Sequence, residues 1–146
     1  MIKNHLKRIN FLGNDPVTIC EVIHPYGGTW SKNDTIYFVN EEGDNLSRIS
    51  VEGGRPKVIV KGKLSDYLHP HILPDDEHIL FNATRNEILA VSNKSLKVTH
   101  IMDEGFDPRY VEPGYLIYNQ RERLMAVRFN IDKLTITGTP FIIHDN

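Results

Sequence analysis

The sequence predicts an all-β fold of stacked four-stranded sheets, on three observations. Short runs rich in Val, Ile, Tyr and Phe recur along its 146 residues, and Gly, Pro, Asn and Asp separate them. Parts of the chain repeat at a spacing near 40 residues, which is typical of propeller blades. The best helical candidate, residues 57–67, is interrupted by Gly62 and begins with a β-branched run. We therefore expect a β-propeller segment of about three four-stranded blades plus an N-terminal half blade.

The repeat sets the boundaries of the units. Residues 6–9 (LKRI) return 40 residues later as residues 46–49 (LSRI), and the match continues without a gap to Ile19 over Ile59. The inner part of the unit returns after 43 residues, where residues 30–31 and 36–38 match residues 73–74 and 79–81. These matches predict one domain over residues 1–146, divided into a half blade (5–20) and three blades (28–60, 71–101 and 108–143).

Each blade is expected to supply four strands in order. In the first blade they lie near residues 29–30 and over residues 35–39, 46–51 and 57–60. In the second, one strand precedes Pro74 and the others cover residues 78–82, 87–91 and 96–101. In the third, one strand precedes Pro113 and the others cover residues 115–118, 124–129 and 141–143. Asp, Asn, Gly and Pro occupy the turns because they tolerate or preset tight-turn dihedrals.

The N-terminal unit is out of phase with the others. Residues 5–20 correspond to the outer two strands of a blade, which gives at most about 14 strands in the chain. Blades bury both faces only between two neighbours, so an open array leaves two apolar faces uncovered. The chain is therefore expected to be part of a larger propeller or the protomer of a homo-oligomer that forms through its exposed end blades.

A family resemblance rests on six motifs, at residues 27–31 (GGTWS), 72–75 (ILPD), 79–81 (ILF), 113–118 (PGYLIY), 124–129 (LMAVRF) and 134–140 (LTITGTP). Taken in order, they resemble TolB-like (WD-repeat-like) β-propeller repeats, especially those attached to bacterial serine/threonine kinases. The family's Ser-Pro-Asp-Gly turn is present only in pieces, at residues 31–34 and 74–77. The resemblance implies a protein-interaction platform or a sensor or gating domain. It carries over no catalytic residue, because relatives share none.

The composition argues against a nucleic-acid-binding protein and against a membrane-spanning one. The chain is 40% hydrophobic and 25% charged with a net charge of −2, and its charges are mixed, which argues against a nucleic-acid partner. No apolar stretch approaches the ~20 residues that cross a bilayer, and the first residues do not form a signal peptide. As it stands the chain is expected in the cytoplasm, and a fragment of a longer secreted protein would be periplasmic or extracellular. Cys20, the only cysteine, is expected to be a small buried hydrophobe.

The candidate binding residues ring one mouth of the expected channel. Tyr26, His69 and Phe106 align at equivalent positions just before each inner strand, where they either form a binding surface or pack between blades. His69 and His71, two residues apart on an extended strand, point to one side and could share a metal with a third ligand. Candidates for that ligand are Asp66, His24 and Asp107. The alternative is a pair of polar loop residues, and no metal or other cofactor is predicted.

The remaining residues of note favour structural roles. Trp30, the only tryptophan, is expected in the core between blades, and the repeated Arg8, Arg48 and Arg128 are expected to contact neighbouring blades or to face solvent. No nucleophile elbow, zinc-protease motif or phosphate loop is present. The leading hypothesis is a non-enzymatic protein- or peptide-binding module. The alternative is a sensor or gating propeller of a hydrolase (a prolyl-oligopeptidase-type peptidase or a glycosidase) or of a receptor kinase.

Overall fold

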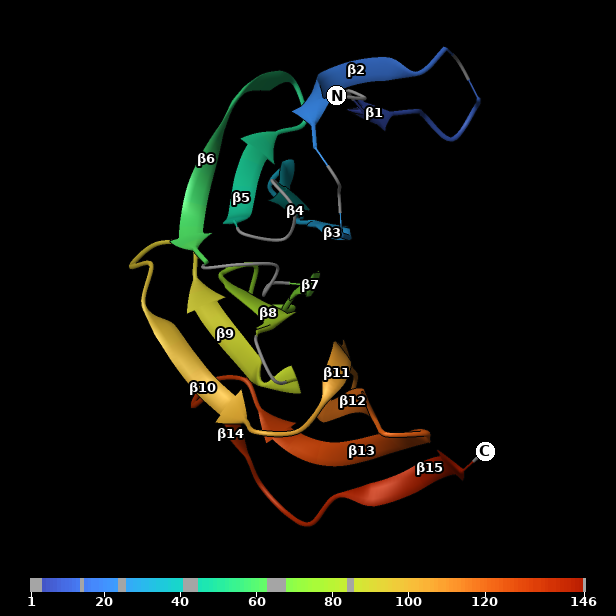
Figure 1. Cartoon of the computed structure of the whole chain (residues 1–146), viewed down its shortest axis with the longest axis vertical. Helices are drawn as coiled ribbons and strands as arrows, with labels where there is room; N and C mark the ends of the chain where they lie inside the picture. The colour runs from blue at the N-terminus through green and yellow to red at the C-terminus, as the bar shows by residue number, and fades with distance from the viewer. Residues whose placement is uncertain are drawn as a thin grey trace.

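The computed structural model describes residues 4–13, 15–23, 26–40, 45–62, 68–83 and 86–145. These residues form β-strands and no α-helix, which confirms the all-β fold class (Figure 1). The N-terminal hairpin comprises β1 (Asn4–Arg8) and β2 (Val17–Val22). None of the described segments is a helix long and apolar enough to cross a membrane.

Three antiparallel sheets follow the hairpin, and we call them the first, second and third blades. The first blade contains β3 (Gly28–Trp30), β4 (Thr35–Asn40), β5 (Asn45–Ser50) and β6 (Gly53–Lys61). The second contains β7 (Leu68–Ile72), β8 (His78–Asn82), β9 (Ile88–Ser92) and β10 (Val98–Met102). The third contains β11 (Phe106–Val111), β12 (Tyr115–Gln120), β13 (Arg123–Asn130), β14 (Thr135–Ile136) and β15 (Phe141–Asp145).

The blades succeed one another along an arc (Figure 1). The first strands of the blades, β3, β7 and β11, lie on the inner side of the arc, and β6, β10 and β15 lie on its outer side. The short strand β14 is an addition to the expected set, because it pairs with only two residues at the end of β13. The hairpin β1–β2 continues the arc beyond the first blade without inner strands of its own.

The outer two strands pair in the same way in all four units. In each unit the register skips one residue of the outermost strand, which is a β-bulge. The skipped residue is an isoleucine every time, at Ile19, Ile59, Ile101 and Ile143. The repeat seen in the sequence is therefore a repeat of strand register, which establishes the hairpin as the outer half of a blade.

The side chains of the central strands point alternately to the two faces of a blade and fill the spaces between blades. On β4, Ile36 and Phe38 pack with the N-terminal hairpin, whereas Tyr37 and Val39 pack with the second blade. On β8, Leu80 packs with the third blade. Successive side chains of a strand point to opposite faces, so each central strand contributes to two layers of the core. We call the face toward the preceding unit the N-terminal face of a blade, and the other its C-terminal face.

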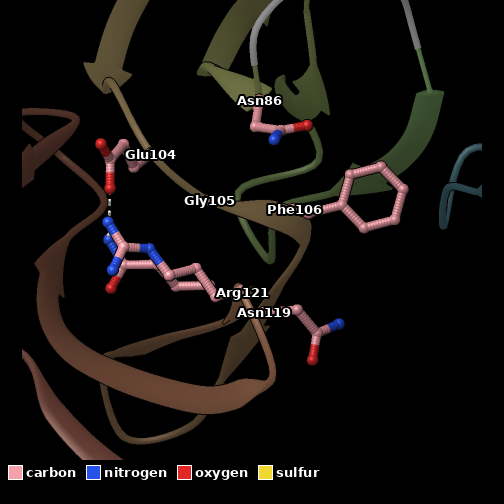
Figure 2. Close-up of a pocket in the computed structure, with 7 residues that line it drawn as sticks. Asn86, Glu104, Gly105, Phe106, Asn119 and Arg121 are labelled. Atoms are coloured by element: carbon pink, nitrogen blue, oxygen red, sulfur yellow. Dashed lines mark hydrogen bonds between the residues drawn. The ribbon is translucent and has the colours of Figure 1, made fainter.

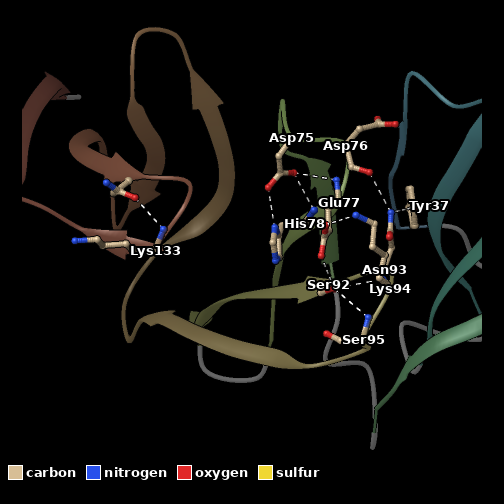
Figure 3. A network of polar contacts seen from close by, with 11 residues as sticks. Tyr37, Asp75, Asp76, Glu77, His78, Ser92, Asn93, Lys94, Ser95 and Lys133 are labelled. Atoms are coloured by element: carbon tan, nitrogen blue, oxygen red, sulfur yellow. Dashed lines mark hydrogen bonds and ion pairs between the residues drawn. The ribbon is translucent and has the colours of Figure 1, made fainter.

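Polar contacts also join the first blade to the second (Figure 3). The Asn93 side-chain amide donates to the Tyr37 hydroxyl at 2.8 Å and to the Asp76 carbonyl at 3.1 Å. Arg48 Nη1 donates to the Asn93 carbonyl at 2.9 Å. Asn93 is only 9% exposed, so these bonds satisfy polar groups that the packing of the two blades removes from water.

The two ends of the arc differ, contrary to the expectation of two apolar faces. On the N-terminal face of the hairpin lie two cross-strand pairs, His5 with Glu21 and Lys7 with Thr18, and all four residues are polar and exposed. The C-terminal face of the third blade carries large apolar side chains, including Phe141 and Ile143 at 50% and 47% exposure. Among the described strand residues of the two ends, those of the third blade have the apolar composition of a blade face.

Candidate functional site

The predicted mouth residues lie together, but their alignment is offset by one. Leu68 pairs with Asn82 in the register in which Phe106 pairs with Asn119, so the equivalent of Phe106 in the second blade is Leu68 and not His69. His69 instead occupies the position of Gly27 and Asp107, and all three have a positive φ, of 55°, 98° and 54°. Gly, Asp and His are among the residues that accept this left-handed conformation. A repeated bulge at the entry of the inner strands explains the offset.

The mouth cluster is held by one backbone bond and one ring contact. The His69 amide donates to the Tyr26 carbonyl at 3.2 Å, and the His69 ring meets the Phe106 ring edge to face, with centroids 4.7 Å apart. Tyr26 is 44% exposed. Asp107 Oδ1 lies 3.6 Å from His69 Nδ1 and 2.7 Å from Arg109 Nη2. No donor of the described residues is aligned with this buried oxygen, so its contacts are ion pairs without a hydrogen bond.

His71 belongs to a repeated contact between inner strands. In the first blade, the Ile72 amide donates to Thr29 Oγ1 at 3.2 Å, which joins β3 to β7. His71 is the register equivalent of Thr29, but its bond runs the other way, because its imidazole donates to the backbone carbonyl of Tyr110, the equivalent of Ile72. Burial, together with the positive charge of Arg109, lowers the pKa of His71 below its usual value. His71 is therefore a contact residue between blades.

The spacing argument for a metal at His69 and His71 is not met. The left-handed residue and the register shift interrupt the alternation that would place both side chains on one side. Of the expected third ligands, His24 and Asp66 lie outside the described residues. Within the described ranges, the three side chains with ligand atoms inside 4.8 Å of one another are Glu87, His100 and Asp103 on the outer strands of the second blade. His100 and Asp103 are exposed there and pair with each other at 3.0 Å.

Trp30 is half exposed, so its predicted place in the core is wrong. It pairs with Ile36 and therefore points to the N-terminal face of the first blade. Its equivalents, Ile72 and Tyr110, are partly buried because each packs with the preceding blade. In the part of the chain that the structure describes, the hairpin β1–β2 supplies no inner strand to cover Trp30. Sequence reasoning placed Trp30 on an inner strand correctly, but the out-of-phase N-terminus was the signal that it would be exposed.

Two hollows meet at Trp30. One, of about 360 Å³, lies toward the N-terminal hairpin and includes Arg8, Asp15 and Val17. The other, of about 400 Å³, runs along the inner strands of all three blades. Its remaining lining residues are Lys32, His71, Ile72, Leu73, Pro74, Asp76, Tyr110 and Glu112. The arrangement combines the half-exposed Trp30 and the partly buried Tyr110 with carboxylates at the rim, which suits an apolar side chain flanked by positive charge.

A third hollow, of about 430 Å³, lies between the second and third blades (Figure 2). Its wall includes Gly105, where a Cβ would come within 2.6 Å of Ile88 Cδ1 and 2.9 Å of Tyr118. The Asn82 amide holds this connection, because it donates to the Gly105 carbonyl at 2.6 Å and accepts from the Asp107 amide at 2.7 Å. Glycine is required here for close packing, and the hollow is a junction between blades.

Two of the repeated arginines contact neighbouring blades and the third, Arg128, faces solvent, which are the two alternatives predicted. Arg8 forms two bonds to the Glu52 carboxylate, at 2.9 and 3.1 Å, and Arg48 reaches Asn93 of the second blade. Arg128 instead lies 5.0 Å from the ring centre of Tyr115 in its own blade. Cys20 is only partly buried, and burial raises the pKa of its thiol.

Three successive antiparallel sheets with a repeated outer bulge define a segment of the β-propeller type. No protein-family model matches the chain, and no curated protein is similar to it in sequence. Solved propeller-type structures are similar in fold. A chain of the nidogen/laminin complex matches with a TM-score of 0.68 and 14% identity, over 88% of this chain and 52% of that one.

Two bacterial structures give comparable matches. The auxiliary nutrient-binding protein of Bacteroides thetaiotaomicron has a TM-score of 0.69 and 14% identity, over 93% of this chain and 36% of that one. The virginiamycin B lyase of Staphylococcus aureus has a TM-score of 0.55 and 16% identity, over 81% and 40%. At these identities the similarity concerns the fold alone. The chain spans 36% to 52% of the length of these three structures.

Proposed function

We propose that the chain is a non-enzymatic binding segment of a larger propeller, and that an extended peptide of a partner protein lies across its inner strands at Trp30. The carrying observation is that one half-exposed tryptophan is shared by two hollows. Tryptophan, tyrosine and arginine are the side chains that dominate binding energy at protein interfaces. A protein partner is supported in general terms by one similar structure, which is that of a complex between two proteins.

The carboxylates at the rims of the two hollows indicate which peptide sequence would bind. Asp15 lies in the first hollow, and Asp76 and Glu112 lie in the second. One oxygen of Asp76 already accepts from the Lys32 amide at 2.8 Å, so Glu112 is the carboxylate more open to a ligand. The favoured segment has an apolar or aromatic residue between Trp30 and Tyr110 and a lysine or arginine beside it, where an exposed ion pair adds specificity more than affinity.

Trp30 supplies the measurement, because its emission reports on this site alone. We expect unstructured peptides with a central Phe flanked by Lys to shift the tryptophan emission saturably, and the same peptides flanked by Glu to bind more weakly. Glu112→Lys should weaken the Lys-flanked peptides by about fivefold to tenfold, the range of one close charge pair. Glu122→Lys, at the turn after β12, is the matched control and should have no effect.

Two results would overturn the proposal. One is the absence of any saturable shift across the peptide set. The other is a hydrolase activity of the chain that disappears when His69 or His71 is substituted, because that would make the inner strands catalytic.

The finer assignment to TolB-like propellers is also a proposal. It is supported by the order of the motifs along the chain, and a hydrolase or kinase domain in the adjoining coding sequence would favour the sensor or gating role. Self-assembly into a homo-oligomer is the alternative to a longer propeller.

A further inference from the structure

We infer that the C-terminal face of the third blade is an interface for a further β-blade, an antiparallel sheet that presents an alternating apolar face. This inference rests on the proposed place of the chain in a larger propeller and identifies the surface involved. Its basis is the register, which lets each position of this face be compared with the same position on a covered face.

The apolar positions of the face match those of a buried one. Leu73, Leu80 and Ile88 on the C-terminal face of the second blade are at most 1% exposed, because the third blade covers them. Their register equivalents on the third blade are Val111, Ile117 and Leu124. Val111 is 42% exposed, and the other two are half-buried. The third blade retains the apolar side chains although nothing described covers them.

The bulge isoleucine gives the same result independently. Ile19 and Ile59 are each 7% exposed, and Ile101 packs partly against the core, each toward the following blade. Ile143 occupies the fourth such position and is 47% exposed. Burying an exposed isoleucine removes apolar surface from water, so a following blade would be stabilised at this position alone.

Two polar positions of the face also match groups that hold a following blade. Asn119 is the register equivalent of Asn82, which binds the connection into the third blade, and the Asn119 side chain is exposed and points away from the second blade (Figure 2). Arg109 is the equivalent of His71, and its guanidinium turns back to Asp107 and to the Pro108 carbonyl of its own strand. A following inner strand would offer backbone groups to both.

The N-terminal end of a second copy of this chain is a poor occupant of the face. The end that it could offer in sequence is the N-terminal hairpin, whose outer face carries His5, Lys7, Thr18 and Glu21. Burying polar and charged groups such as the Lys7 ammonium against an apolar face would remove them from water, which is costly. The N-terminal faces of the three blades instead carry alternating apolar residues, such as Ile79, Phe81 and Val91 on the second blade. The occupant is therefore a blade with a face of that kind.

The test uses two cysteine variants with equal exposure on opposite faces. Ile143 and Ile142 are both 47% exposed, but Ile142 pairs with Met125, whose side chain belongs to the core beneath the third blade. Ile143→Cys and Ile142→Cys are each made in a Cys20→Ser background, and the rate of maleimide labelling is measured. An added copy of residues 68–102 is then joined after Asp145 through the Asp-Glu-Gly connection found before Phe106.

We expect the added blade to slow labelling at position 143 by about tenfold, as when the covered state is about ten times as populated as the open one, and to leave position 142 unchanged. Phe81→Asp in the added copy should restore labelling at position 143. Unchanged labelling at 143, or equal protection of 142, would overturn the inference. Protection of position 143 in the unextended chain that grows with protein concentration would overturn it too, because a second copy would then cover the face. Peptide binding at Trp30 is measured separately, so failure of either proposal is recognisable by itself.

Discussion

The C-terminal faces of the second and third blades carry the same pattern of apolar side chains, yet the face of the second blade is buried and that of the third is exposed to solvent. Leu80 is fully buried and its equivalent Ile117 is not, and Asn82 is 2% exposed whereas Asn119 lies at the surface. The two faces differ in what lies next to them and hardly at all in their own residues. In a stacked repeat, the face of one blade is buried by the blade next to it. An apolar face without a neighbour therefore indicates that a partner covers it.

The largest expected effect comes from truncating the apolar centre of each face. Leu80→Ala should lower the free energy of unfolding by about 2–5 kcal/mol, because it opens a cavity between two blades. Ile117→Ala should cost about 1 kcal/mol or less, since its side chain already contacts solvent. Urea denaturation of both variants measures the difference. Equal losses would mean that the third-blade face is closed in solution, contrary to the comparison.

A smaller difference is expected for the two asparagines. Asn82→Ala removes the partners of the Gly105 carbonyl and the Asp107 amide and should cost about 1–3 kcal/mol. Asn119→Ala, at the same register position on the open face, should stay within about 0.5 kcal/mol of the parent chain. Amide hydrogen exchange at Asp107 gives a local measurement, and it should become faster only in the first variant. Unchanged exchange in Asn82→Ala would remove this contact as a link between blades.

The same comparison shows what the sequence could and could not predict. The repeat of Leu6 at Leu46, and of Ile19 at Ile59, identified the outer strands because a bulge with a fixed apolar residue leaves a strong local pattern. Trp30 was misplaced, because its exposure depends on strands that the hairpin lacks. The sequence alignment chose His69 where the structural equivalent is Leu68, one residue earlier. The reason is that the bulge residue with a left-handed φ adds one residue to the strand without pairing with the neighbouring strand.

The hollow at Trp30 could not be predicted from the sequence for a related reason. Trp30 and Tyr110 are 80 residues apart, and only the curvature of the arc brings their strands to one side. Lys32, Asp76 and Glu112 lie in turns, where charged residues are expected to be solvated in any fold. The predicted mouth residues did come together, because each precedes an inner strand, but whether they bind a ligand stays a prediction.

The smallest effect expected is a change in the pH dependence of stability. The lowered pKa of His71, caused first by burial and then by the charge of Arg109, means that the unfolded chain takes up this proton more readily than the folded one. The contribution of the unprotonated His71 side chain to the free energy of unfolding is therefore complete above the unperturbed histidine pKa of about 6.5. It is lost as the pH falls through that value. His71→Thr introduces the residue found at the equivalent position, Thr29, which carries no titrating group, so it should remove this loss. The free energy of unfolding, measured by urea denaturation from neutral to mildly acidic pH, should fall less steeply in this variant than in the parent chain. Parallel curves for the variant and the parent chain would show that His71 is not buried between the second and third blades.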